Sequence, residues 1–175
     1  YFFQNPCVSF SSWQLLNRGT RTFENPLGDG TNPAEKAANE LTGWLAKCLL
    51  IIHAAGKVAV FENQEPDGRY PKVWNLEPLQ KAIRSTGAVI VPSTMCAFGL
   101  SPPDQPGLRH RKRLWLMVSS ALMPHMAFMW RRCGSRDHVP LAGNVPGTSL
   151  NRTQTAARYP SGFCRAFLAC LHQAY

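Results

Sequence analysis

The hydrophobic residues of the chain follow a helical period in two stretches, and both stretches predict helices. Between residues 33 and 55, leucine and isoleucine recur on one helical face, so we expect a long helix there. Asn32 and Pro33 are typical of a helix start, and Gly56 is typical of a helix end. A second helix is predicted over residues 76–86.

Shorter apolar runs bounded by turn residues predict strands. They comprise the aromatic start of the chain at residues 1–4 and three later segments, at residues 57–61, 88–91 and 114–118. Strand, helix, strand, helix, strand is the alternation of an α/β sheet. Beyond it, residues 119–130 fit either a strand or a helix because Pro124 interrupts the pattern, and a last helix is expected within residues 153–175.

Composition and charge add a preference for certain partners. The chain has 175 residues, 45% hydrophobic and 17% charged, which predicts one globular domain with a real core. Its formal net charge is +9, which favours a polyanionic partner over a role in solubility alone. Nucleic acid is the first choice of polyanion, and an anionic membrane surface the second. The longest apolar run, residues 48–55, is too short to span a bilayer, and no amphipathic basic helix stands out, so we expect no membrane partner.

Six cysteines are spread along the chain without a CxxC pair, at positions 7, 48, 96, 133, 164 and 170. This spread is typical of a reduced, intracellular protein and not of a disulfide framework. Cys133 and His138 have a spacing that could supply two ligands to zinc. A structural zinc site needs four ligands and the other two are not evident, with Cys96 and His125 elsewhere in the chain, so zinc stays a less favoured alternative and no metal ligand is assigned.

Three candidate functional motifs stand at the ends of three predicted strands. They are a Pro-Cys pair at residues 6–7, a Glu-Asn pair at residues 62–63 and a basic run at residues 109–113. Open α/β folds keep reactive residues at the carboxyl edge of the sheet. Residues 14–32, which follow the first motif, are expected to form an irregular active-site loop. Taken singly, the motifs also fit a structural cysteine, a strand-end turn and a solvated or nucleic-acid-binding face.

In this order the motifs resemble those of the DNA cytosine-5 methyltransferases. The segments that carry the resemblance are Pro6-Cys7-Val8-Ser9-Phe10-Ser11, Phe61-Glu62-Asn63, Phe98-Gly99-Leu100 and Arg111-Lys112-Arg113-Leu114-Trp115-Leu116. The segment at residues 151–160 is similar to the closing motif of the family. Trp74, the Cys133-x4-His138 element and Tyr159-Pro160 are also similar to methyltransferase-like segments carried by eukaryotic mobile elements.

The resemblance implies a fold and an activity. The fold would be α/β, a Rossmann-like methyltransferase sheet with flanking helices that lacks its N-terminal cofactor-binding strands. Residues 1–175 would form a single partial catalytic domain, with residues 119–175 contributing nucleic-acid contacts. The activity would be S-adenosylmethionine-dependent methyl transfer to carbon 5 of cytosine in DNA, on a base flipped out of the stack. The protein would be nuclear if its host is eukaryotic.

The resemblance also implies residue roles. Cys7 would be the nucleophile, Glu62 its acid partner, and Arg111 and Arg113 electrophilic or phosphate contacts, with Arg113 the more inward-pointing of the arginines. The remaining roles are cofactor contacts at Asn5, Pro6 and Asn63, and nucleic-acid contacts at Ser9, Ser11, Arg109, Lys112, Arg131 and Arg132.

Several positions depart from the family pattern. Asn5, Gln64 and Arg109 stand where the family usually has proline, valine and glutamine. The glycine-rich cofactor turn of the family lies upstream of the nucleophile loop, so the main S-adenosylmethionine pocket is expected upstream of this chain. The abrupt hydrophobic start, which has no signal-peptide features, predicts a fragment cut just before or within a strand.

Two other functions stay open. A non-catalytic nucleic-acid-binding module would keep the fold and the basic face, and would tolerate the loss of Cys7. A thiol hydrolase would pair Cys7 with one of the five histidines, although none of them lies in a recognisable partner motif.

Overall fold

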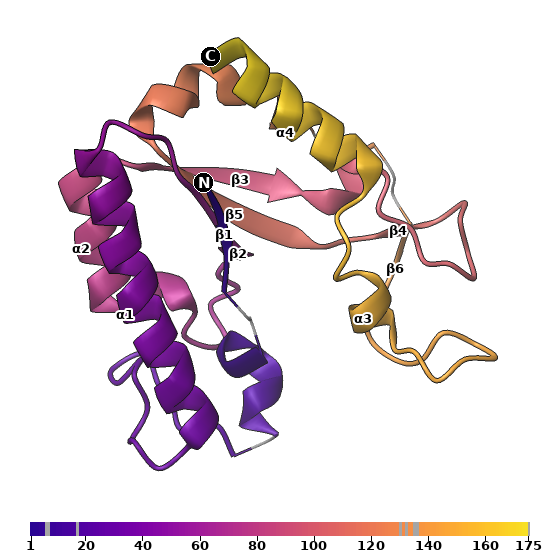
Figure 1. Cartoon of the computed structure of the whole chain (residues 1–175). Helices are drawn as coiled ribbons and strands as arrows, with labels where there is room; N and C mark the ends of the chain where they lie inside the picture. Colours follow the sequence, from indigo (N-terminus) through magenta and orange to yellow (C-terminus); the bar gives the residue numbers. More distant parts are fainter. Residues whose placement is uncertain (6–7, 17, 130, 132, 135–136, 175) are drawn as a thin grey trace. The chain divides into compact units, whose positions relative to one another are not determined.

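A computed structural model describes residues 1–5, 8–16, 18–129, 131, 133–134 and 137–174 (Figure 1). The chain divides into two compact units. Unit 1 comprises Tyr1–Ile90 and Trp115–Met123, and unit 2 comprises Val91–Leu114 and Pro124–Tyr175. The fold is mixed α/β, as the sequence predicted.

The main sheet has four strands in the order β1-β2-β5-β3. The strands are β1 (Phe2–Gln4), β2 (Val60–Gln64), β3 (Val89–Thr94) and β5 (Arg113–Val118). β1 and β2 are parallel, with Phe2 opposite Val60 and Gln4 opposite Glu62. Parallel neighbours need a crossover connection, and the helix α1 (Pro33–Ala54) lies in the segment that joins β1 to β2.

The helices of unit 1 confirm the predicted helices to within a residue or two. α1 begins at Pro33 because the Asn32 side chain accepts hydrogen bonds from the amides of Ala34 and Glu35, at 3.0 and 3.4 Å. α2 (Glu77–Thr86) ends at Gly87, which has a φ of 62° that glycine adopts without strain. α1 and α2 pack side by side (Figure 1).

One hydrophobic core joins these two helices to the sheet within unit 1. Its buried side chains come from α1, α2, β2, β5 and the short 3-10 helices η1 (Val8–Phe10) and η3 (Val73–Asn75). They include Phe10, Leu45, Leu49, Phe61, Val73, Trp74, Leu79 and Met117. A further 3-10 helix, η2 (Ser12–Leu15), follows η1. This core includes Phe61 of β2, the strand that carries Glu62 and Asn63.

The second strand differs from its prediction in a way that matters for the site. The sequence predicted a strand at residues 57–61 that ends before Glu62, whereas β2 runs over Val60–Gln64. Glu62 and Asn63 are therefore inside the strand and buried. The apolar run misplaced the boundary because strand pairing, with the amide of Val60 donating to the carbonyl of Tyr1 at 2.8 Å, decides where β2 begins.

Unit 2 contains several short elements and one longer helix. β4 (Arg109–His110) and β6 (His138–Val139) form a parallel two-stranded sheet. The helices are the 3-10 turn η4 (Met95–Phe98), α3 (Arg152–Thr155) and α4 (Ser161–Ala174). The ambiguous stretch after β5 is a 3-10 helix, η5 (Ser120–Met129), that contains Pro124. None of the described helices combines the length and apolarity that crossing a membrane requires.

The contact between α4 and η4 gives a prediction about unit 2. A Cβ atom at Gly162 would lie 2.5 Å from the carbonyl oxygen of Phe98. We expect Gly162→Ala to destabilise unit 2 by about 1–3 kcal/mol, because the helix must move away from rigid backbone. Gly43→Ala is the control, since its Cβ meets nothing within 4 Å, and it should stabilise α1 by about 0.5–1 kcal/mol. Equal effects of the two changes in thermal unfolding would contradict this contact.

Candidate active site at the end of two parallel strands

The predicted nucleophile loop leaves β1 beside the acidic end of β2. β1 and β2 are parallel and in register at Gln4 and Glu62, so Asn5 emerges next to Glu62 and Asn63. The Nδ2 atom of Asn63 donates a hydrogen bond to the backbone carbonyl of Asn5 at 2.9 Å. All three of these side chains are buried, with at most 2% exposed. Pro6 and Cys7 lie outside the described residues.

The Asn5 and Asn63 side chains form hydrogen bonds that connect this strand end to α1 and to the neighbouring backbone. Asn5 Nδ2 donates to Thr42 Oγ1 on α1 at 2.9 Å, and Thr42 in turn donates to the carbonyl of Ala38 at 2.7 Å. The Asn63 Oδ1 atom accepts from the amide of Gln64 at 2.9 Å. Asn63 therefore uses both ends of its amide within the protein. Asn5 Oδ1 is buried with no hydrogen-bond partner among the described residues, and one acceptor stays available there.

An aromatic group holds the end of β2 from the other direction. Trp74 Nε1 donates to the carbonyl of Gln64 at 2.6 Å. The Trp74 ring meets the Phe61 ring edge-on at a centroid distance of 5.3 Å and lies 5.8 Å from Trp115. The backbone around Glu62 is thus fixed by strand pairing with β1 and β5, and by the hydrogen bond and ring packing of Trp74.

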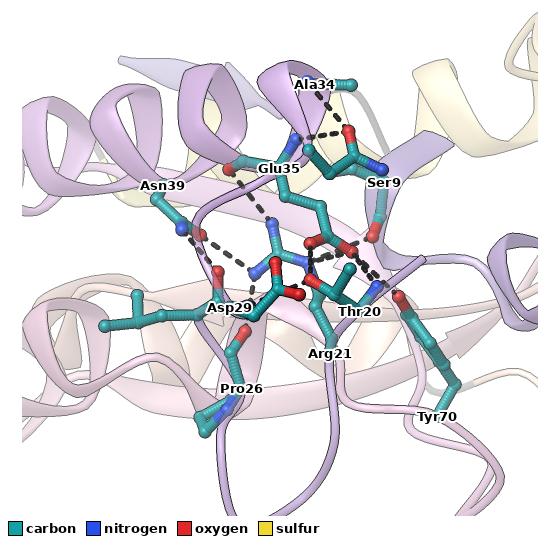
Figure 2. A network of polar contacts seen from close by, with 12 residues as sticks. Ser9, Thr20, Arg21, Pro26, Asp29, Ala34, Glu35, Asn39 and Tyr70 are labelled. Atoms are coloured by element: carbon teal, nitrogen blue, oxygen red, sulfur yellow. Dashed lines mark hydrogen bonds and ion pairs between the residues drawn. The ribbon is translucent and has the colours of Figure 1, made fainter. Parts of the chain in front are cut away.

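A buried polar network organises the loop that follows the nucleophile motif (Figure 2). Its centre is Arg21, whose side chain is fully buried. The guanidinium donates to the carbonyls of Ser9, Pro26 and Glu35 at 3.2, 2.5 and 3.2 Å, and to Asn39 Oδ1 at 2.8 Å. It also lies 4.2 Å from the centroid of the Phe10 ring, where a cation–π interaction adds to the hydrogen bonds.

Glu35 is the anionic partner in this network. Its carboxylate accepts hydrogen bonds from the amide and hydroxyl of Thr20, at 3.0 and 2.5 Å, and from the Tyr70 hydroxyl at 3.3 Å. Glu35 Oε1 lies 3.8 Å from Arg21 Nε. Burial lowers the pKa of Arg21 from its usual value, and the charge of Glu35 opposes that shift. The network therefore joins the loop to α1, to η1 and to the segment that carries Tyr70.

Sequence reasoning did not find this network. Glu35 falls within the predicted helix at residues 33–55, and Arg21 within the predicted irregular loop at residues 14–32. No short motif links the two residues, because their contact depends on how the loop folds back on α1. The buried ion pair of Arg21 with Glu35 ties the loop to α1, and the hydrogen bond from Arg21 to the carbonyl of Ser9 ties it to η1, which follows the predicted nucleophile position.

Tyr70 makes the network sensitive to high pH. Burial, followed by the charge of Glu35, raises the pKa of its hydroxyl from 10.0 to about 12. The folded state holds this proton more tightly than the unfolded state, so the stabilisation is complete below pH 10 and is lost as pH rises to about 12. We expect the stability difference between wild type and Tyr70→Phe to shrink across that window in urea unfolding. Parallel stability curves would argue against the Tyr70–Glu35 contact.

The predicted basic residues belong to unit 2, and they differ in burial and in hydrogen bonding. Arg109 is half-buried and its Nη1 atom donates to Ser101 Oγ at 2.5 Å. Lys112 is also half-buried and donates to the carbonyl of Ala156 at 3.1 Å. Arg111 and Arg113 are exposed, as is Arg131, whose guanidinium lies 5.6 Å from the Phe98 ring centroid. Arg132 lies outside the described residues.

The orientation predicted for Arg113 was wrong. The sequence analysis expected it to point inward, but Arg113 is exposed at the start of β5. Side chains alternate along a strand, and Leu114 and Leu116 occupy the buried face here. In unit 1, Ser9 is buried and its backbone carbonyl accepts from Arg21, while Ser11 is half-buried. Their nucleic-acid contacts stay predictions.

Comparison of the chain with models of known protein families, with curated proteins and with solved structures gave no match. The functional inference therefore depends on the residues and their geometry. The best-supported site is the strand end at which Asn5, Glu62 and Asn63 meet.

Proposed function

We propose that the chain is part of the catalytic domain of an S-adenosylmethionine-dependent DNA cytosine-5 methyltransferase, with a Rossmann-like sheet. One observation supports the proposal above all others, the hydrogen bond from Asn63 Nδ2 to the carbonyl of Asn5 at 2.9 Å. It ties the backbone that leads into Cys7 to the strand that carries the buried Glu62. Since Cys7 follows Asn5 by two residues, covalent geometry keeps their Cα atoms within roughly 7 Å of each other.

The proposed chemistry explains why these residue types belong together. The Cys7 thiolate adds to carbon 6 of cytosine, and the electrons of the 5,6 double bond then make carbon 5 nucleophilic. Glu62 supplies the proton or hydrogen bond that stabilises charge developing at ring nitrogen 3. A buried carboxyl is suited to this role because it is held in place and shielded from water. After carbon 5 has taken the methyl group, loss of its proton to a base and expulsion of Cys7 as a thiolate would restore the aromatic ring.

The cofactor is proposed from the resemblance, and the residues at the strand end fit it in part. S-adenosylmethionine, when bound, supplies an electrophilic methyl group. The unpaired Asn5 Oδ1 offers one acceptor at the carboxyl edge of the sheet, where open α/β folds bind ligands. Asn63 positions the backbone of Asn5, since both ends of its amide are already used. Pro6 stays a predicted contact.

Nucleic acid is the proposed partner. The net charge of +9 favours a polyanion, and Arg111 and Arg113 are the exposed members of the basic run. We propose that these two arginines contact the phosphates of DNA. The protein would then act inside the cell, and in the nucleus if the host is eukaryotic. The same observations favour a second candidate, a DNA-binding module that keeps this fold without catalysis.

Covalent trapping tests the proposal. The protein, with any native sequence that precedes this chain in place, is incubated with S-adenosylmethionine and a pool of duplexes in which 5-fluorocytosine replaces cytosine. Fluorine at carbon 5 cannot leave as a proton does, so an active enzyme should stay attached to the DNA through the peptide that contains Cys7. Salt-sensitive DNA binding without any adduct would reject the enzyme and leave the binding module.

A further inference from the structure

A second cluster of reactive side chains lies in unit 2, away from the residues of the proposed active site in the sequence. Cys96, Cys133 and His138 bring their ligand atoms, two sulfurs and one ring nitrogen, within 4.8 Å of one another. Cys133 Sγ lies 3.3 Å from His138 Nε2. We propose that these three residues form a zinc site.

The spacing of the atoms suits tetrahedral coordination. Zinc bonds of about 2.3 Å to sulfur and 2.0–2.1 Å to nitrogen place neighbouring ligand atoms roughly 3.5–3.8 Å apart. The distance of 3.3 Å between Cys133 Sγ and His138 Nε2 is close to that value. All three ligand atoms lie within 4.8 Å of one another, so the most distant of them would have to move closer by about 1 Å at most to bind one ion. Thiolates and imidazole are also the ligands that favour zinc over the oxygen-seeking magnesium and calcium ions.

The backbone of unit 2 holds the ligands in place. Cys96 lies in η4, which is fixed at its start by the amide of Met95 donating to the carbonyl of Lys112 at 2.8 Å. His138 lies in β6, which pairs with β4 so that Arg109 is opposite His138. β4 in turn reaches η4, because the amide of His110 donates to the carbonyl of Leu100 at 3.0 Å. The segments that carry Cys96 and His138 therefore belong to one hydrogen-bonded frame, and the Cys133 side chain contacts His138.

A metal ion would add stability to a frame that buries little apolar surface. η4, β4 and β6 are only two to four residues long, and such short elements bury little apolar surface. Zinc bound by Cys96, Cys133 and His138 would link η4 to β6 directly. Three protein ligands leave the fourth tetrahedral position to water or to a small exogenous ligand.

Cobalt substitution tests the site without reference to methyl transfer. Reduced, metal-free protein is titrated with Co²⁺, and we expect one ion per chain with the intense visible bands of tetrahedral cobalt and a thiolate charge-transfer band. Cys96→Ser, Cys133→Ser and His138→Gln should each lower the affinity more than about tenfold. Cys164→Ser is the matched control, because Cys164 is exposed on α4 in the same unit, and it should leave the titration unchanged.

Two further measurements distinguish a loss of metal binding from a loss of folding. Circular dichroism identifies any variant that fails to fold, and Zn²⁺ should raise the thermal midpoint of wild type but not that of a folded ligand variant. Wild-type protein that shows only the weak bands of hydrated Co²⁺ would overturn the proposal. So would folded ligand variants that bind like wild type, or reduced protein that takes up no metal and re-forms a Cys96–Cys133 disulfide once the reductant is removed.

Discussion

Arg21→Met is expected to lower the free energy of unfolding of unit 1 by about 3–5 kcal/mol, the range for removing one partner of a buried ion pair. The guanidinium makes four hydrogen bonds and stacks on Phe10. Methionine keeps much of the volume but leaves the Glu35 carboxylate without its cation. It also leaves three carbonyl groups short of a donor, and each unpaired buried acceptor adds to the cost.

A double substitution separates the ion pair from general damage. In Arg21→Met/Glu35→Leu the buried carboxylate is gone as well, so we expect less destabilisation than the sum of the single changes. Arg84→Met is the matched control, since Arg84 is exposed on α2 in the same unit, and it should change stability by less than about 0.5 kcal/mol. Urea unfolding measures all of these variants. Additive effects would show that Arg21 and Glu35 are not coupled.

Glu62→Gln is expected to slow covalent addition to cytosine by about 10²–10⁴-fold, the usual contribution of a general acid. Glutamine has the same shape as glutamate and should keep the packing of the buried site, with a stability change below about 1 kcal/mol. It cannot transfer the proton that ring nitrogen 3 requires. The measurement is the rate of adduct formation with 5-fluorocytosine duplex under single-turnover conditions.

Glu77→Gln provides the control for this charge change. Glu77 is exposed at the start of α2, where it pairs with Lys81 at 2.8 Å, and its loss should not alter the addition rate. The affinity for duplex DNA should be the same in both variants. A Glu62→Gln protein that forms the adduct at the wild-type rate would remove Glu62 from the proposed chemistry.

The local parts of the fold could be predicted because local residues decide them. α1 begins where Asn32 caps it, and α2 ends where Gly87 takes the left-handed conformation. The boundary of β2 could not be placed in the same way, since it depends on pairing with a segment far away in the chain. Arg113 was misjudged because strand alternation puts Leu114, and not the arginine, on the buried face.

The sites likewise combine motifs that are visible in the sequence with contacts that form only when distant segments fold together. The Pro-Cys and Glu-Asn motifs could be read from the sequence, and the structure brings Asn5 to Glu62 and Asn63. The ion pair of Arg21 with Glu35 left no motif, because the loop must fold back before the two residues meet. The spacing of Cys133 and His138 indicates a possible ligand pair in the sequence, whereas Cys96 is far from them along the chain and its sulfur comes within 4.8 Å of their ligand atoms only in the folded protein.

Release of tritium from DNA that carries [5-³H]cytosine tests the central claim most directly, because it requires the strand-end site and no cofactor. When Cys7 adds to carbon 6, carbon 5 can take a proton from water, and reversal of the addition then loses tritium to the solvent. We predict release by wild type, none by Cys7→Ser, and 10²–10⁴-fold slower release by Glu62→Gln, about the loss of a general acid. Release that is equal in wild type and Cys7→Ser, or absent from wild-type protein that binds the DNA, would contradict the account.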